Sequence, residues 1–372
     1  MPWMEIAGLS WVCEPLADTS RLERLWTELE ARSDCPFFLT WDWVGTWLSE
    51  TPNLSPLQLS VYEGSTVVGL ALLQPTSFRR HFGRTPALLL HQSGEPSADL
   101  ITMEYNGVLS DRHYARRVEA GLFSFLTKSA ILKPRGEVHV ALATDFVADR
   151  AREAGLVVTE LVRMPSWFVD LNAVRASGQQ YLESLSSNTR GQINRSLRMY
   201  QQRGPIKATA AHSAEEALEF FDELKTLHQK AWIDRGRPGS FASSHFERFH
   251  RTLIDRCIGR GTAEIVRVTA GSHLIGQVYN FIRDGRIYAY QTGLSYESEP
   301  KLKPGLVCHC MCIDRHLGKG ASAYDFMAGN ARYKANLGIR GPDLAHYMIE
   351  RKTLRSQGLS FARRLKGLFV NR

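Results

Sequence analysis

Residue types near the end of the chain could bind a phosphate and deliver a proton. Lys303, Pro304 and Gly305 are typical of a helix start, because proline suits the first turn and glycine lets a ligand approach the backbone. Free backbone N–H groups in such a turn bind phosphate or pyrophosphate, and Lys301 adds positive charge nearby. Farther along, the phenol of Tyr333 keeps its proton at neutral pH and can donate it to a strongly basic atom. The pattern predicts an anion site close to a proton donor.

A strand, a helix, a second strand and a short helix must position these groups. We expect the first strand at 286–293, a helix from Pro304, the second strand at 323–327 and a short helix beside Tyr333. In a regular strand, alternate side chains share a face. The two faces are then expected to carry Tyr288, Tyr290 and Thr292, and Ala289, Gln291 and Gly293, respectively. This order of elements is what a transferase with an acyl-CoA donor would need.

Length and charge limit the possible classes of function. With 372 residues and 44% hydrophobic content, the chain is large enough for two domains with their own cores. The formal net charge is +8, but residues 351–372 hold seven Lys or Arg and no acid, which leaves +1 for the rest. The basic balance therefore describes a tail, and we expect no specific nucleic-acid partner.

The sequence also predicts where the protein works. No apolar run reaches the roughly 18 residues of a spanning helix, and the first twenty residues lack a charged-then-apolar leader, so we expect a cytoplasmic protein. The six cysteines show no framework spacing and are expected to be reduced. Apolar residues recur at roughly helical spacing among the cations of 351–372. This tail predicts peripheral association with an anionic membrane surface, with a partner-binding or partly disordered arm as the alternatives.

An internal echo divides the chain. Val61–Gly69 (VYEGSTVVG) aligns with Val268–Gly276 (VTAGSHLIG) at an offset of 207 residues. Each segment is typical of a strand, a tight Gly-Ser turn and a second strand, and each follows a mostly helical stretch. The echo favours two duplicated α/β halves.

The remaining periodicity predicts hairpins and helices in both halves, which is an α/β (α+β) fold with a mixed sheet. Further helices are expected at 20–33, 113–128, 178–203, 213–234 and 243–259. Further strands are expected at 57–63, 66–75, 86–91, 105–109, 137–142, 156–162, 206–211, 263–269 and 273–282.

Several short motifs in order resemble one family. They are SSNTRGQINRSLRMYQQRG, His228-Gln-Lys-Ala-Trp232, YAYQTGLSYE, Lys303-Pro-Gly305, Tyr324-Asp-Phe326 with Gly329, and Tyr333-Lys334. Over residues 167–338 the chain resembles the CelD-like acyltransferases, a branch of the GNAT fold related to the FemAB group. The resemblance implies tandem GNAT-like domains with mixed, mostly antiparallel sheets flanked by helices. Residues 1–165 would be an acceptor-side half, 166–345 the acyltransferase domain and 346–372 a basic tail.

The resemblance implies acyl-CoA as the donor substrate. In the GNAT fold the strand that matches 287–293 splays from its neighbour and pairs with the pantetheine arm. The helix start here departs from the usual glycine-rich Q/R-x-x-G-x-G/A loop. The residues implied in donor binding are Gln291, Thr292, Gly293, Lys303, Gly305 and Leu306. Ordinary cross-strand packing and a plain helix cap are the alternatives.

Three residues are candidates for the chemistry. The resemblance implies that Tyr333 protonates the departing thiolate. Asp325 lies among strand-like apolar residues, so it is either a structural anchor or an active-site base. His228 could accept the proton of the nucleophile, although it could also form a core pair with Trp232 one turn away.

Other polar residues could bind the acceptor. Arg195 and Arg198 lie three apart on a helix and can converge on one anion, with a solvated surface as the alternative. Tyr290 could touch the substrate, and Lys334 could bind a phosphate or a carboxylate. Cys308, Cys312 and His316 share a helical face over about 12 Å, which is too long for one ion, so no metal site is expected.

The features together predict an acyltransferase. The acyl group would pass directly to an amine or hydroxyl of a sugar-nucleotide, glycan precursor or amino-acid-like acceptor, since the family is linked to polysaccharide production. One alternative is a FemAB-type aminoacyl transferase that uses aminoacyl-tRNA, disfavoured by the missing charged coiled-coil insertion and the nearly neutral body. The other is a non-catalytic module that recruits polysaccharide machinery to the membrane through its tail.

Overall fold

The computed structural model describes residues 3–80 and 83–352, which form two compact units. Pro165–Pro342 make up the second unit, and the first contains the preceding chain together with residues from Asp343 onward. The boundaries fall inside β8 (Val157–Asp170) and β14 (Ile339–Glu350). The second unit is therefore inserted into the sequence of the first. Within the described residues, no helix has the length and apolar character needed to cross a membrane.

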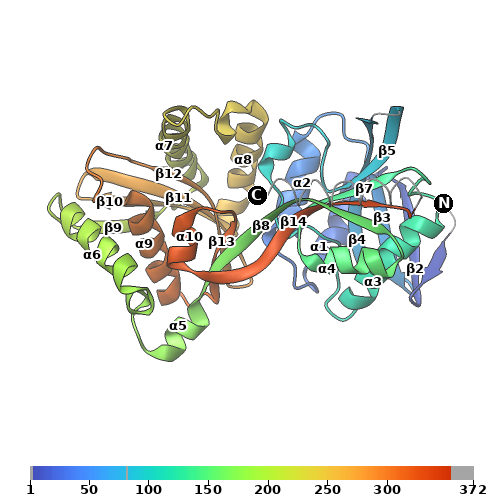
Figure 1. The fold of residues 1–372 in the computed structure, drawn as a ribbon, viewed down its shortest axis with the longest axis horizontal. Helices are drawn as coiled ribbons and strands as arrows, with labels where there is room; N and C mark the ends of the chain where they lie inside the picture. Colours follow the sequence, from blue (N-terminus) through green and yellow to red (C-terminus); the bar gives the residue numbers. More distant parts are fainter. Residues whose placement is uncertain (1–2, 81–82, 353–372) are drawn as a thin grey trace, which may run out of the picture. The chain divides into compact units, whose positions relative to one another are not determined.

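The first unit is a mixed sheet flanked by helices (Figure 1). Its strand order is β1-β2-β3-β4-β5-β7-β14-β8, in which β5 and β7 are parallel and β1 to β5 pair antiparallel. The strands are β1 (Met4–Ile6), β2 (Leu9–Pro15), β3 (Leu57–Glu63), β4 (Thr66–Arg80), β5 (Gly83–Leu90), β6 (Leu109–Ser110) and β7 (Glu137–Ala143). The helices are α1 (Thr19–Glu30), α2 (Trp41–Glu50), α3 (Ala115–Lys128) and α4 (Asp145–Glu153).

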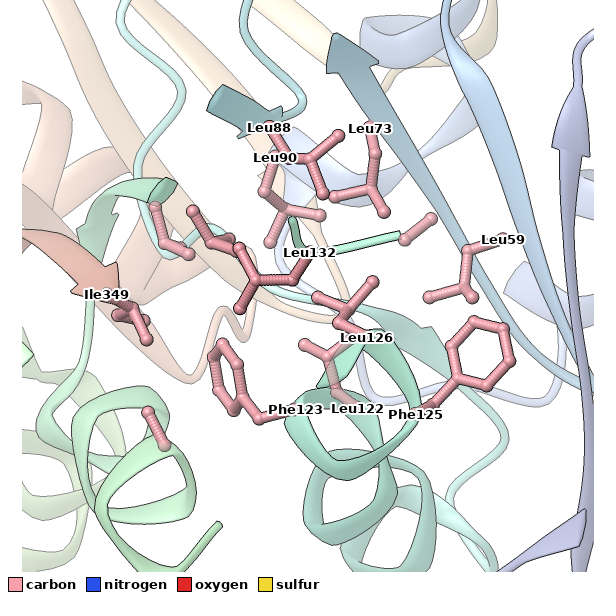
Figure 2. Close-up of a cluster of buried hydrophobic side chains, with 14 of the residues drawn as sticks. Leu59, Leu73, Leu88, Leu90, Leu122, Phe123, Phe125, Leu126, Leu132 and Ile349 are labelled. Atoms are coloured by element: carbon pink, nitrogen blue, oxygen red, sulfur yellow. The ribbon is translucent and has the colours of Figure 1, made fainter. Parts of the chain in front are cut away.

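One core of the first unit lies between its sheet and α3. Leu122 and Leu126 of α3 recur at helical spacing and point toward Leu59 and Leu73 of the sheet (Figure 2). All four side chains are buried, and each contributes about 1.5–3 kcal/mol by leaving water.

The second unit is also a mixed sheet between helices. Its strand order is β8-β13-β12-β11-β10-β9, with β12 and β13 parallel and the other pairs antiparallel. The strands are β9 (Ile206–Ala210), β10 (Ala263–Ala270), β11 (His273–Arg283), β12 (Arg286–Leu294) and β13 (Ala323–Ala328). The helices are α5 (Leu171–Ser177), α6 (Ser187–Gln201), α7 (Ala214–Ile233), α8 (Ser244–Cys257), α9 (Pro304–Gly318) and α10 (Arg332–Leu337). As predicted, the helix α9 provides the crossover between the two parallel strands.

The two faces of β11 pack against different helices (Figure 1). Val278 joins the core that contains Val307 and Cys308 of α9. Tyr279 lies edge-on against His250 of α8, with ring centroids 5.6 Å apart. The sheet therefore separates α7 and α8 from α6 and α9.

The two hairpins of the internal echo match residue for residue. Val61 pairs with Gly69 in β3 and β4, and Val268 pairs with Gly276 in β10 and β11. The register shifts by one residue directly after Val61 and again directly after Val268. Gly64 and Gly271, which occupy the two turns, both have φ +59°. The structure thus confirms that the echo is a repeated hairpin with a repeated bulge.

Two predicted elements are wrong. The helix expected at 178–203 begins only at Ser187, because Gly178 ends α5 with a left-handed backbone (φ +68°), a short 3-10 helix covers Tyr181–Ser184 and Ser186 caps α6. The strand expected at 105–109 is mostly loop, because Tyr105 has a positive φ of 53° and only Leu109–Ser110 pairs. The sequence analysis predicts no strand at the positions of β1, β2 or β14.

Residues 353–372 of the expected basic tail lie outside the described residues, whereas residues 346–350 form the end of β14. The first cation of the tail is also described. Arg351 donates to the carbonyl of Leu132 at 2.9 Å and to that of Thr127 near the end of α3. This side chain is therefore an anchor on the first unit, and the prediction for the rest of 351–372 stays a prediction.

Candidate functional site

A cavity of about 550 Å³ opens in the second unit beside β12 and the start of α9. Seven residues expected at the site line it: His228, Gln291, Thr292, Lys303, Gly305, Leu306 and Tyr333. They belong to four elements or the loops that adjoin them. The first and last of these residues, His228 and Tyr333, are more than one hundred residues apart in sequence. The fold therefore brings together most of the donor-site residues that the sequence singled out.

One wall of the cavity is a strand with an open edge. The parallel pairing of β12 with β13 covers only Arg286–Tyr288, whereas β12 continues to Leu294. On its other edge β12 stays paired with β11 as far as Leu294. From Ala289 onward, the edge on the side of β13 has no strand partner in the described chain. The side-chain oxygen of Gln291 covers one amide of this segment, that of Thr292, at 3.1 Å.

Bulges explain why the strands separate here. Tyr279 pairs with Gln291 and Asn280 pairs with Ala289, so Tyr290 is an extra residue in β12. In β13, Phe326 is likewise an extra residue against β8. A bulge bends its strand and increases the local twist. Both bulges follow the short paired segment, and the two strands diverge at that point.

The start of α9 offers free backbone donors. Pro304 occupies the first turn. The first amide of α9 that has a hydrogen-bond partner is that of Val307, which donates to the carbonyl of Lys303 at 3.1 Å. The amides of Gly305 and Leu306 have no partner among the described residues. Since α9 has fifteen residues, its N-terminus carries a favourable dipole for an anion.

Tyr333 lines the same cavity. Its ring stacks on His309, with centroids 5.2 Å apart and planes 11° from parallel, and meets Phe326 edge-on. The hydroxyl has no hydrogen-bond partner in the described part of the chain. Burial, with a smaller effect of Tyr296, raises the pKa of Tyr333 to about 12. The phenol is therefore fully protonated at neutral pH and free to donate.

His228 lies on α7 at the cavity wall. Its ring is 4% exposed and packs against Trp232 and Phe241. Nδ1 lies 3.2 Å from the side-chain oxygen of Gln229. Burial, helped by Arg235, lowers the pKa of His228 to about 4. The imidazole is neutral at physiological pH, so it is an acceptor of low basicity, and it also has the aromatic contacts of a core residue.

Asp325 and Lys334 lie away from the cavity. The carboxylate of Asp325 is fully buried, bonds Arg286 at 2.7 Å and accepts the amide of Met327 at 2.7 Å. The ammonium of Lys334 donates to the carbonyl of Ala328 at 2.6 Å. The structure favours the anchoring role for Asp325, which the sequence left open, and gives Lys334 a similar role at the end of β13.

Gly293 and Tyr290 also lie outside the cavity lining. A Cβ atom on Gly293 would lie 2.5 Å from the carbonyl oxygen of Leu224, so this glycine allows α7 to approach β12. Tyr290 turns toward α8, where its hydroxyl lies 3.2 Å from Nε2 of His250. The expected alternation of faces fails at Tyr290, because the bulge adds a residue there.

Arg195 and Arg198 are exposed on α6 and do not line the cavity. The guanidinium of Arg198 donates to the carbonyl of Asn194 in its own helix at 3.3 Å. Their predicted role in acceptor binding stays a prediction.

The sequence analysis gave no site role to several lining residues, among them Arg235, Tyr296 and His309. The guanidinium of Arg235 lies over the ring of Tyr296, 5.3 Å from its centroid. His309 follows Gly305 by one helical turn on the same face, and this spacing could have identified it. The nearby thiols of Cys308 and Cys312 are buried with raised pKa values, because burial disfavours their charged forms. Among the described residues, no group of side chains could hold a metal ion.

The first unit has a cavity of its own, of about 400 Å³, at the start of α3. Tyr105, Asn106 and Gly107 line it, as do Arg116 and Glu119 of α3. Burial raises the pKa of the Glu119 carboxyl. This cavity is more crowded with charged side chains than the one beside α9.

Comparison with known families identifies the second unit. Residues 187–335 match the family model described as the acetyltransferase (GNAT) domain. The second unit therefore contains a GNAT acetyltransferase domain. The matched residues include the open strand β12, the start of α9 and Tyr333. Among curated proteins, none matches this chain in sequence.

Solved structures share the fold of this GNAT protein at low identity. The crystal structure of FemX is 11% identical, with 96% of this chain and 98% of that chain covered and a TM-score of 0.57. The C-terminal domain of a putative lysylphosphatidylglycerol synthetase from Agrobacterium fabrum is 10% identical, with 94% and 97% covered and a TM-score of 0.54. L-PGS from Bacillus licheniformis is 12% identical, with 93% and 96% covered and a TM-score of 0.53. These similarities establish the fold, including its relation to FemX.

Proposed function

We propose that the second unit transfers an acyl group from acyl-CoA to an amine or hydroxyl acceptor. The observation that carries this proposal is that one cavity meets three groups: the open edge of β12, the free amides of α9 and the hydroxyl of Tyr333. The diphosphate of the donor would accept hydrogen bonds from the N–H groups of Gly305 and Leu306, and Lys303 would add positive charge. The pantetheine arm would pair with the free edge of β12, as an added strand does.

The transfer would be direct. The lone pair of the acceptor nitrogen or oxygen attacks the thioester carbonyl, a new C–N or C–O bond forms and the C–S bond breaks. The sulfur leaves as a thiolate and takes the proton of Tyr333, and a thiolate in a dry cavity is more basic than one in water. The acceptor loses its own proton to His228 or to solvent, and Tyr333 regains a proton from solvent before the next turnover.

The acceptor would be a sugar-nucleotide, a glycan precursor or an amino-acid-like molecule, with polysaccharide synthesis as the process served. In this proposal the first unit is the acceptor side. Arg195 and Arg198 would attract an anionic acceptor to the second unit. Residues 351–372 would add weak attraction to an anionic membrane surface.

A second candidate uses aminoacyl-tRNA as the donor, in the manner of the FemAB group. The shared fold with FemX and with a domain of a putative lysylphosphatidylglycerol synthetase favours it. A nearly neutral body disfavours it, since tRNA binding draws on extended positive surface. A non-catalytic recruiting module is the third candidate, and it predicts no binding of either donor.

Titration calorimetry with acetyl-CoA, longer acyl-CoAs and charged tRNA separates the three candidates. We expect acyl-CoA to bind and to release free thiol, detected by a thiol-reactive dye, when acceptor amines are added. Retention of tRNA without binding of any CoA thioester would support the aminoacyl transferase. Binding of neither donor would contradict both transferase proposals.

A further inference from the structure

His309 is a buried polar residue in the cavity lining to which the proposed reaction gives no role. It lies on α9, one turn after Gly305, and its side chain is 2% exposed although it lines the cavity. Its imidazole contacts three aromatic rings from two other elements. The ring is nearly parallel to that of Tyr333 and meets Phe326 at 80°, with centroids 5.2 Å apart in both cases.

The plane of this imidazole is fixed by a hydrogen bond. Nδ1 of His309 lies 3.0 Å from the hydroxyl of Tyr324 in β13. Tyr324 is completely buried, and its hydroxyl also hydrogen-bonds Cys312, one turn farther along α9. A phenylalanine at position 309 could stack on Tyr333, but it could not bond Tyr324. The histidine therefore links β13 and α9 to the ring of Tyr333.

Tyr333 needs such a support because of where it lies. The helix α10 has only six residues, too few for an isolated helix to be stable, and Tyr333 is the second of them. An aromatic stack is worth about 0.5–1.5 kcal/mol beyond the area it buries. Because His309 stacks on the ring of Tyr333 and Phe326 meets that ring edge-on, few alternative rotamers are open to Tyr333.

The imidazole keeps its role over the physiological pH range. Burial, with a smaller effect of Lys334, lowers the pKa of His309 to about 3. The ring is therefore neutral, and its bond to Tyr324 does not change with pH between 5 and 9.

We propose that His309 is a positioning residue: fixed by Tyr324, it holds the phenol of Tyr333 at the point of the cavity where the leaving sulfur takes its proton. The inference rests on the proposed acyl transfer. It assigns His309 no direct part in proton transfer, so its effect on the rate should pass entirely through Tyr333. A misplacement of about 1 Å at a reacting group can lower a rate about a hundredfold.

A double-mutant cycle tests this assignment, with acyl-CoA as the donor and free thiol as the readout. We expect His309→Ala to lower kcat about tenfold to a hundredfold. Its Kd for CoA should stay within about twofold of wild type, because the amides of α9 remain in place. His309→Phe, which keeps the stack, should lie between His309→Ala and wild type. In a Tyr333→Phe background, His309→Ala should have almost no further effect, because the group it positions is absent.

Two results would overturn the inference. One is a His309→Ala effect of equal size with and without Tyr333. The other is a loss of CoA affinity parallel to the loss of kcat, which would show a general structural role. Tyr324→Phe, which removes one hydroxyl, provides the same test if His309→Ala does not fold, and it should lower kcat about fivefold to tenfold. Failure of the wild-type protein to bind any CoA thioester would contradict the proposed function as well, whereas turnover with an additive cycle would contradict the positioning role alone.

Discussion

The two units use the same hairpin and the same parallel strand pair, yet they differ at the point where a donor would enter. In the second unit, β12 runs six residues beyond its pairing with β13, after a bulge at Tyr290. In the first unit, β5 pairs with β4 without a bulge and ends one residue beyond its pairing with β7. One extra residue in a strand therefore accompanies the difference between an open edge and a closed one. The comparison teaches that a duplicated fold does not duplicate its site.

The helices α9 and α3 begin alike in their backbone and differ in the side chains around them. The amides of Gly305 and Leu306 in α9 have no partner among the described residues, and neither have those of Ala115 and Arg116 in α3. The cavity near α3 is lined by Arg116 and Glu119, which suits a charged acceptor better than a pantetheine arm. The following changes test whether the second unit alone carries the chemistry.

The largest expected effect is that of Tyr333→Phe. Removal of one phenol should lower kcat about a hundredfold to a thousandfold, because general acid catalysis contributes about that much, and should leave the Kd for acyl-CoA nearly unchanged. The readout is free thiol release. Tyr105→Phe, at the cavity of the first unit, is the matched control and should leave the rate within twofold. An equal loss in both variants would contradict the assignment of catalysis to the second unit.

Acid should destabilise both units, because each buries neutral histidine. In the first unit, burial lowers the pKa of His91 to about 4, and Nε2 of this ring accepts the amide of Leu72 at 3.0 Å. His228 has a similarly lowered pKa in the second unit. A folded pKa below the unfolded value of about 6.5 means that the unfolded state binds more protons, so stability falls as pH drops from 6.5 toward 4.

From pH 7 to pH 5, each of these histidines should reduce the free energy of unfolding by about 2 kcal/mol. Urea unfolding at the two pH values measures this loss. His91→Gln should remove part of the pH dependence from the first unit and leave that of the second unit unchanged. A stability that is equal at pH 5 and pH 7 would contradict the neutral, buried state of these rings.

Matched glycines in the repeated hairpins should respond differently to alanine. A Cβ atom on Gly276 would lie 2.7 Å from the carbonyl oxygen of Gly293, a backbone atom that cannot move away easily. On Gly69, the nearest atoms are side-chain carbons of Val118 and Val61 at 3.0 Å. We expect Gly276→Ala to lower the free energy of unfolding by about 2–3 kcal/mol and Gly69→Ala by about 1 kcal/mol. Denaturant titrations that show the opposite order would contradict the closer packing of the second hairpin.

The smallest expected effect concerns the start of α9. Gly305→Ala would place a Cβ atom 3.1 Å from Cδ1 of Leu294, beside the proposed diphosphate site. We expect the Kd for CoA to rise about fivefold to tenfold, because the ligand could no longer approach the backbone as closely. Gly318→Ala, at the other end of α9, meets no neighbour within 4 Å and should leave CoA binding unchanged. If calorimetry gives the same Kd for CoA in both variants, the diphosphate does not bind at the start of α9.

Much of the second unit could be predicted from its sequence, since its strands and helices carry strong periodicity and a clear Pro-Gly start. The bulge at Tyr290 could not, because it arises from the pairing of β12 with β11 and leaves no local signal. That single residue changed the face on which Tyr290 lies. Asp325 illustrates a second limit: a buried acid has the same sequence pattern whether it anchors an arginine or faces a ligand.

The first unit was predicted less completely for a different reason. The residues that β14 contributes to the first unit follow the second unit in sequence, so no pattern within residues 1–165 predicts them. Short strands such as β1 and the loop around Tyr105 lack periodicity, because positive φ angles interrupt them.

The late return of the chain has a practical consequence for anyone who shortens this protein. Ala345, Tyr347 and Ile349 of β14 are completely buried in the core that holds β7 and α3, although they lie within thirty residues of the C-terminus. A truncation placed just after Pro342 would look like removal of a dispensable basic end. It would instead withdraw a central strand from the half of the molecule that contains the N-terminus, and that half would be the one to unfold.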